Sequence, residues 1–141
     1  VLKSGADANY SNPETGWPVL HWAVDSRNNE AISKLVEFGA DPNLVAADGI
    51  SPIQRACMEG DEPAVRLLAS FGGIVHTKGP GDLTAMHWCG ACGSIDAAQA
   101  LLELGADVLA RDKEGNTARD HARNNNEVDT ERFLARAEEG G

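Results

Sequence analysis

The stretch Gly39-Ala40-Asp41-Pro42-Asn43 decides the fold, because related stretches return at a fixed interval along the chain. Gly72-Gly73-Ile74-Val75-His76 follows 33 residues later, and Gly105-Ala106-Asp107-Val108-Leu109 follows after another 33. An earlier copy, Gly5-Ala6-Asp7-Ala8-Asn9, lies 34 residues upstream. A second landmark keeps the interval of 33: Leu20-His21-Trp22-Ala23, Ile53-Gln54-Arg55-Ala56, Met86-His87-Trp88-Cys89 and Arg119-Asp120-His121-Ala122. Two landmarks in phase indicate a repeat protein.

Each repeat predicts two short helices joined by a turn. Ser51 and Thr84 are favourable N-cap residues, and Pro52 suits the first helical position. Gly39 and its counterparts close the second helix, because glycine adopts the left-handed conformation without steric penalty. Apolar residues at helical spacing complete the pattern. The expected helix pairs are 18–25 with 28–37, 51–58 with 61–70, 84–91 with 94–103, and 117–124 with 127–136.

Two of these segments carry a family resemblance. Ser51-Pro52-Ile53-Gln54-Arg55-Ala56 and Thr84-Ala85-Met86-His87-Trp88-Cys89 resemble the Thr-Pro-Leu-His-x-Ala signature of ankyrin repeats. The glycine turns and the 33-residue period match the same family, and the resemblance covers essentially the whole chain. It implies an all-α solenoid of stacked helix-turn-helix units with hairpin loops projecting to one side. Because no helix pair can bury its apolar stripe alone, neighbouring repeats must stack.

The chain is expected to form a single ankyrin-repeat domain over residues 1–141. Its units are a truncated repeat end at 1–11, repeats at 12–45, 46–78 and 79–111, and a C-terminal cap repeat at 112–141. Arg119 at an apolar position and Asp120 in place of histidine indicate the cap, since a terminal repeat needs a polar outer face. The first full repeat departs at Pro18, where the family has threonine. We expect the native array to continue upstream of Val1.

Composition excludes several classes of partner. Twelve basic and 22 acidic side chains give a net charge of −10, which disfavours nucleic acid and anionic membrane surfaces. No stretch approaches the roughly 18 unbroken apolar residues of a membrane span. Three cysteines are too few for a disulfide framework, so we expect a reducing compartment, the cytoplasm or the nucleus.

Candidate chemistry is sparse. The resemblance implies that His21 and His87 tie each first helix to the adjacent turn through hydrogen bonds, while His121 shows no evident partner. Cys89 and Cys92 leave one alternative open, a thiol-responsive or metal-binding element, although a structural zinc site needs four ligands. No nucleophile–base–orienter set and no phosphate-binding glycine loop is evident. We therefore expect no enzyme and no cofactor.

The resemblance implies partner binding on a concave face made by the hairpin tips and the first helices. Trp17 precedes the first helix of its repeat, and apolar residues follow in the same register, rimmed by acidic side chains. Exposed apolar rows of this kind mark interaction sites, and tryptophan is enriched among binding hot spots. We expect a protein or peptide partner with basic and apolar side chains. The predicted contact residues are Glu14, Trp17, Asp25, Asp48, Ile50, Met58, Glu59, Leu83 and Cys92.

Trp22 and Trp88 occupy one register position, with Arg55 between them. The resemblance favours partial burial of both rings between adjacent repeats, and an aromatic–arginine–aromatic stack is the alternative.

Three positions are candidates for modification. Asn9 and Asn43 match the hairpin asparagine that members of the family present to an asparaginyl hydroxylase, and His76 stands at the corresponding place in the next repeat. The alternative is that asparagine simply suits the turn. We expect a monomer, with self-association through the N-terminal stacking face as the alternative.

Overall fold

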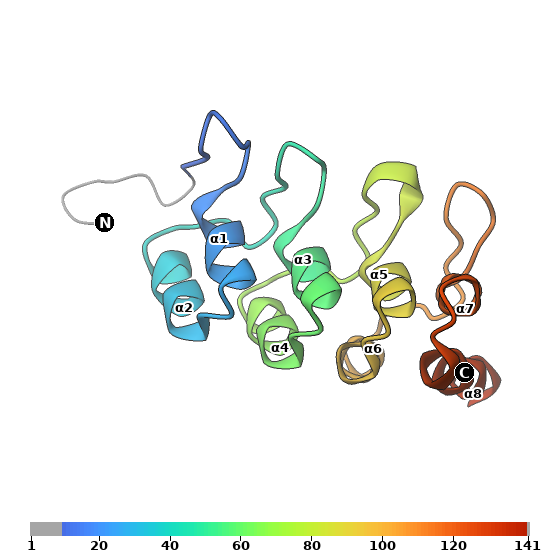
Figure 1. Cartoon of the computed structure of the whole chain (residues 1–141). Coiled ribbons are helices and arrows are strands. Elements are labelled where there is room, and N and C mark those ends of the chain that lie inside the picture. The colour runs from blue at the N-terminus through green and yellow to red at the C-terminus, as the bar shows by residue number, and fades with distance from the viewer. Residues whose placement is uncertain (1–9, 141) are drawn as a thin grey trace.

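Helices form two parallel rows in the computed structural model, which describes residues 10–140. The first helices of the pairs lie in one row beneath projecting loops, and the second helices lie in the other row (Figure 1). This is the all-α solenoid expected from the repeat pattern. Within the described residues the helices are α1 (Val19–Asp25), α2 (Asn29–Glu37), α3 (Pro52–Glu59), α4 (Glu62–Ser70), α5 (Ala85–Cys92), α6 (Ile95–Glu103), α7 (Ala118–Asn124) and α8 (Val128–Gly140), with a 3-10 turn η1 (Pro80–Asp82).

Helix boundaries agree with the expected ranges to within one or two residues, except at the end of α8. This helix was expected to end at residue 136, but α8 continues to Gly140. The run Ala137-Glu138-Glu139 favours helix, and no glycine turn interrupts it before residue 140. The last helix is therefore longer than its counterparts.

The helix starts follow the predicted capping signals. Ser51 accepts a hydrogen bond from the Gln54 N–H, and the Gln54 side chain accepts one from the Ser51 N–H in return. Thr117 and Asp120 form the same reciprocal box at α7. Asp120 thus replaces histidine in the capping role, and this bond from the Thr117 N–H lowers the pKa of the Asp120 carboxyl.

The core is continuous along the stack and lies between the two rows of helices. Its largest fully buried apolar side chains repeat from unit to unit, which confirms that neighbouring repeats bury one another's apolar stripes. Burial of each is worth roughly 1.5–3 kcal/mol. Gly90 marks the closest approach, because a Cβ there would collide with the Ala118 carbonyl oxygen of α7. The large core residues are Leu20, Ile32, Ile53, Leu68, Met86, Leu101 and Leu134.

Polar side chains inside the first helices join successive repeats. His21 Nε2 donates to the Ile50 carbonyl (2.7 Å), and His87 Nε2 donates to the Asn116 carbonyl (2.9 Å). Gln54 Nε2 makes the equivalent bond to the Leu83 carbonyl (3.1 Å). Each bond reaches 29 residues forward into the next hairpin. The structural role expected of the two histidines is confirmed.

No helix within residues 10–140 combines the length and the apolar character needed to cross a bilayer.

Candidate functional site

The exposed side chains of the first helices form a surface that we call the first-helix face. Its rows follow the 33-residue register, so side chains of one row come from successive repeats. Figure 1 shows α1, α3, α5 and α7 side by side beneath their loops. The rows are Trp22, Arg55, Trp88 and His121; Asp25, Met58, Ala91 and Asn124; and Ser26, Glu59, Cys92 and Asn125.

Trp17, Trp22 and Arg55 form an aromatic–cation cluster at the N-terminal end of this face. The two indole rings meet edge to face with centroids 5.0 Å apart. Arg55 Cζ lies 4.9 Å from the centroid of the Trp17 ring, within the range of a cation–π interaction. Trp22 remains 46% exposed, so one large aromatic surface is open to a partner.

Two carboxylates hold Arg55 in place. Arg55 Nη2 lies 2.6 Å from Asp25 Oδ1 on α1 and 3.2 Å from Glu59 Oε2 on its own helix. The hydrogen bond from Arg55 keeps the pKa of the Asp25 carboxyl below its usual value. One cation and two anions leave the cluster with a net negative charge. An exposed indole beside surplus negative charge suits a basic side chain.

These contacts correct one expectation about the tryptophans and argue against the alternative stack. Trp22 is exposed rather than partly buried, because the neighbouring repeat offers Arg55, which turns toward Trp17 instead. Trp88 is half-buried as expected. The arginine therefore stacks on the hairpin tryptophan and does not bridge Trp22 and Trp88.

Trp17, Ile50 and Leu83 occupy one register position in successive hairpins, and this apolar row is interrupted at Ile50. Trp17 and Leu83 are half-buried, but Ile50 is only 6% exposed and offers a partner almost no surface. Its expected exposure is wrong, because the segment that carries it packs onto the preceding repeat, where the Ile50 carbonyl accepts from His21. The order of apolar and polar residues along a short segment cannot show which side chains face the neighbouring repeat.

The acidic and sulfur-containing candidates lie around the cluster. Met58 Sδ lies 3.7 Å from Arg55 Nη1, and Glu59 and Asp25 pair with the same arginine. Glu14 and Asp48 are exposed in the hairpins and belong to the rim.

Leu83 lines a hollow on the same face, with a volume of about 430 Å³. His121 Nε2 donates to Asp112 Oδ2 there (2.7 Å), and the His121 ring meets the His87 ring edge to face. Burial opposes ionisation of Asp112, but bonds from the Asn116 N–H and from His121 keep the pKa of this carboxyl below its usual value. His121 therefore has a partner, contrary to expectation. Sequence reasoning missed this pair, although His121 shares the register of Trp22 and Trp88.

Comparison with known proteins supports the same fold. A family model described as "Ankyrin repeats (3 copies)" matches residues 1–75 and 20–112. The chain belongs to the ankyrin-repeat family. It is 30% identical over 119 residues to "SH3 and multiple ankyrin repeat domains protein 2" of Homo sapiens, covering 84% of this chain and 6% of that protein. It is 33% identical over 129 residues to "Ankyrin repeat and SOCS box protein 6" of Homo sapiens, covering 83% and 30%.

Some relatives are enzymes that contain ankyrin repeats. "Tyrosine-protein kinase HTK16" of Hydra vulgaris is 28% identical over 110 residues, which cover 77% of this chain and 14% of that protein. The chain therefore spans 6–30% of the length of these three relatives. Ankyrin repeats are in general non-catalytic protein-interaction modules.

The thiols of this ankyrin chain are free. Cys57 and Cys89 are fully buried and hydrogen-bonded to each other across the contact of α3 with α5, whereas Cys92 is exposed. Burial raises the pKa of both Cys89 and Cys92, which disfavours the reactive thiolate. Within residues 10–140, no three His, Cys, Asp or Glu side chains group as metal ligands.

Asn43 joins two ankyrin turns through its side-chain amide. Its Nδ2 donates to the Gly72 carbonyl (3.0 Å), and its Oδ1 accepts from the Ile74 N–H (2.8 Å). The Asn43 amide is thus engaged in the contact between the two turns. His76, in the same register one repeat later, is exposed, and Asn9 lies outside the described residues. Modification of Asn43 stays a prediction.

Proposed function

We propose that this protein is a non-catalytic binding module whose first-helix face receives a protein segment with basic and apolar side chains. The observation that carries the proposal is the cluster of Trp17, Trp22 and Arg55 with its surplus negative charge. Tryptophans supply much of the energy at protein interfaces, and a half-exposed indole leaves a contact surface ready.

The net charge supports the choice of a basic partner. A chain with a net charge of −10 attracts cationic segments over a distance of about one Debye length and speeds their association. The exposed Glu14 and Asp48 add negative charge at the rim of the first-helix face. An acidic partner would be repelled at the same surface.

The spacing between the aromatic–cation cluster and the hollow at Leu83 suggests the length of the partner segment. Trp17 and Leu83 stand at the hairpins of the first and third repeats, and stacked helices lie about 8–10 Å apart, so the separation is about 20 Å. An extended peptide rises about 3.3 Å per residue, so roughly six residues span this distance. We propose that a basic residue contacts Trp22 and that an apolar residue enters the hollow at Leu83.

The test compares two pairs of substitutions against one captured partner. A partner isolated from the native cell is titrated by calorimetry into the wild type, Trp22→Ala/Leu83→Ala and Phe38→Ala/Ile74→Ala. The first pair removes the proposed contacts and should weaken binding roughly 30-fold, since a hot-spot residue contributes about 2 kcal/mol. The second pair removes exposed apolar side chains (62% and 53%) outside this face and should leave affinity unchanged. Equal affinities for all three proteins would contradict the proposal.

We further propose that the protein works in a reducing compartment, the cytoplasm or the nucleus. Cys57, Cys89 and Cys92 are all free thiols, and none of them forms a disulfide that an oxidising compartment would stabilise. Fractionation of the native cell tests this assignment, and recovery with secreted proteins would overturn it.

A further inference from the structure

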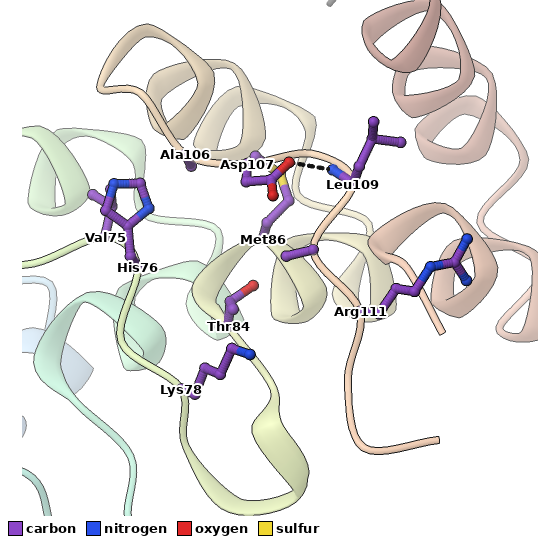
Figure 2. A pocket seen from close by; sticks show the side chains of 10 residues that line it. Val75, His76, Lys78, Thr84, Met86, Ala106, Asp107, Leu109 and Arg111 are labelled. Atoms are coloured by element: carbon purple, nitrogen blue, oxygen red, sulfur yellow. Dashed lines mark hydrogen bonds between the residues drawn. The ribbon is translucent and has the colours of Figure 1, made fainter. Parts of the chain in front are cut away.

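A pocket of about 480 Å³ opens between the second and third repeats (46–78 and 79–111), away from the first-helix face. It lies between the turn at 74–78 and the turn at 106–111 (Figure 2). None of its lining residues lines the hollow at Leu83. The residues that matter for the argument are Val75, His76, Lys78, Met86, Asp107 and Leu109.

The preceding repeat makes a pair of hydrogen bonds between its turns that this pair of turns lacks. There, the Asn43 carboxamide donates to the Gly72 carbonyl and accepts from the Ile74 N–H, which joins one turn to the next. His76 stands exactly one 33-residue period after Asn43. Within the described residues, His76 makes no corresponding bond to the Gly105 carbonyl or the Asp107 N–H. The two turns that line the pocket are therefore not joined by these bonds.

Without this join, a hydrogen-bond donor that lines the pocket and an acceptor two residues before it have no partner within the described chain. The Asp107 N–H and the Gly105 carbonyl occupy the register of the two groups that Asn43 satisfies one repeat earlier. The Asp107 carboxylate is already engaged, since it accepts from the Leu109 N–H (2.9 Å), as the dashed line in Figure 2 shows. A carboxamide donates and accepts through adjacent atoms, which matches this pair.

We propose that this pocket binds the carboxamide side chain of an asparagine or glutamine from a partner protein, in the position that Asn43 fills within the chain itself.

Side chains of both charges line the pocket. Lys78 extends toward the facing turn, whereas Arg111 points away from it, with Nη1 bonded to the Gly115 carbonyl (2.7 Å) (Figure 2). Lys78 and Asp107 therefore bring opposite charges to the pocket, and the guanidinium of Arg111, which also lines it, is engaged by a carbonyl. The pocket floor is formed by the buried Val75 and Met86, which leaves room for an apolar residue beside the carboxamide.

The experiment uses acetamide as the probe and amide NMR shifts of the whole chain as the readout. In the wild type, acetamide should give a saturable shift at the Asp107 N–H. His76→Asn places a carboxamide in the same register within the chain and should weaken that response at least tenfold. The Ile74 N–H, already bonded to Asn43, should not respond, and Asn43→His should make it responsive. Acetate and methylammonium, tested alongside, should shift the Asp107 N–H at least tenfold more weakly than acetamide.

Each outcome decides for or against the pocket. A response that does not saturate, or that is equal in the wild type and in His76→Asn, overturns the proposal. Stronger binding of acetate or methylammonium overturns the carboxamide assignment in favour of an ion site. His76→Asn copies a residue that the fold already accepts at Asn43, so this arm stands even where Asn43→His fails to fold. Neither substitution touches Trp22 or Leu83, so the outcome is independent of the proposed binding on the first-helix face.

Discussion

Individual side chains form the hydrogen bonds between repeats, and two of them, His21 and His87, make the stability of the fold depend on pH. The neutral imidazole of His87 accepts from the Thr84 N–H at Nδ1 (3.0 Å) and donates at Nε2 to the Asn116 carbonyl. Protonation would place a second proton on Nδ1 and break the bond from Thr84. Burial lowers the pKa of His87, and it lowers that of His21 in the same way. Both residues are therefore built into the fold as neutral groups.

Acidification should destabilise the protein below about pH 6.5. The unfolded chain takes up protons at His21 and His87 near that pH, while the folded chain resists until their lower pKa values are reached. Since the unfolded state then binds more protons, the free energy of unfolding falls by at most about 1.4 kcal/mol per pH unit for each histidine. Urea denaturation between pH 5 and 8 measures the slope.

The chain supplies its own control for this effect. Gln54 makes the same two bonds as His87, one from its N-cap N–H and one to the next hairpin, without titrating. His87→Gln should therefore keep the fold and reduce the pH dependence by the share of one histidine. An unchanged slope in this variant would contradict the assignment.

At the scale of the helix, α1 has the weakest N-terminal cap among the first helices. Its N-cap is Pro18, which makes no side-chain cap, whereas Ser51, Thr84 and Thr117 all form capping boxes. The Nδ1 atom of His21 is buried without a partner, because proline has no N–H to donate to it. One departure from the family signature thus removes the hydroxyl cap and leaves His21 Nδ1 unpaired.

Replacing this proline should stabilise the protein. Pro18→Thr adds a hydroxyl cap and an N–H that reaches His21 Nδ1, as Thr84 does for His87. The expected gain in the free energy of unfolding is about 1 kcal/mol. Pro18→Ala is the matched control, since it supplies the N–H without the hydroxyl. If both variants stabilise equally in urea denaturation, the hydroxyl cap is not the cause.

At the scale of the molecule, the stack behaves as a row of units that contact only their neighbours. The pair α3–α4 packs against α1–α2 on one side and α5–α6 on the other, whereas α1–α2 has a described neighbour on one side only. In such arrays, stability is the sum of repeat terms and interface terms. The middle of the stack is therefore the most strongly held part.

Hydrogen exchange should reveal this gradient. Backbone amides of α3 and α4 should exchange at least tenfold more slowly than those of α1 and α2, because opening the middle pair breaks two interfaces. Exchange of this chain followed by NMR tests the expectation. Equal protection in α1–α2 and α3–α4 would mean that the chain opens as one unit.

Local signals in the sequence were sufficient for the helices but not for the binding surface. The period of 33, the caps at Ser51 and Thr84 and the closing glycines act over a few residues, so they placed most helix ends within one or two positions. The contact of Arg55 with Asp25 joins residues 30 apart, and its geometry depends on how two helices pack. No local pattern encodes that geometry.

The sequence alone therefore determined the repeat and the helix pairs, because both depend on short-range propensity or on a period counted along the chain, and its resemblance to ankyrin repeats implied the ties from His21 and His87. Only the tertiary structure decided that Ile50 is buried, that Trp22 is exposed and that a gap opens beside His76. These outcomes depend on which side of a segment faces the neighbouring repeat, and packing across the interface sets that orientation.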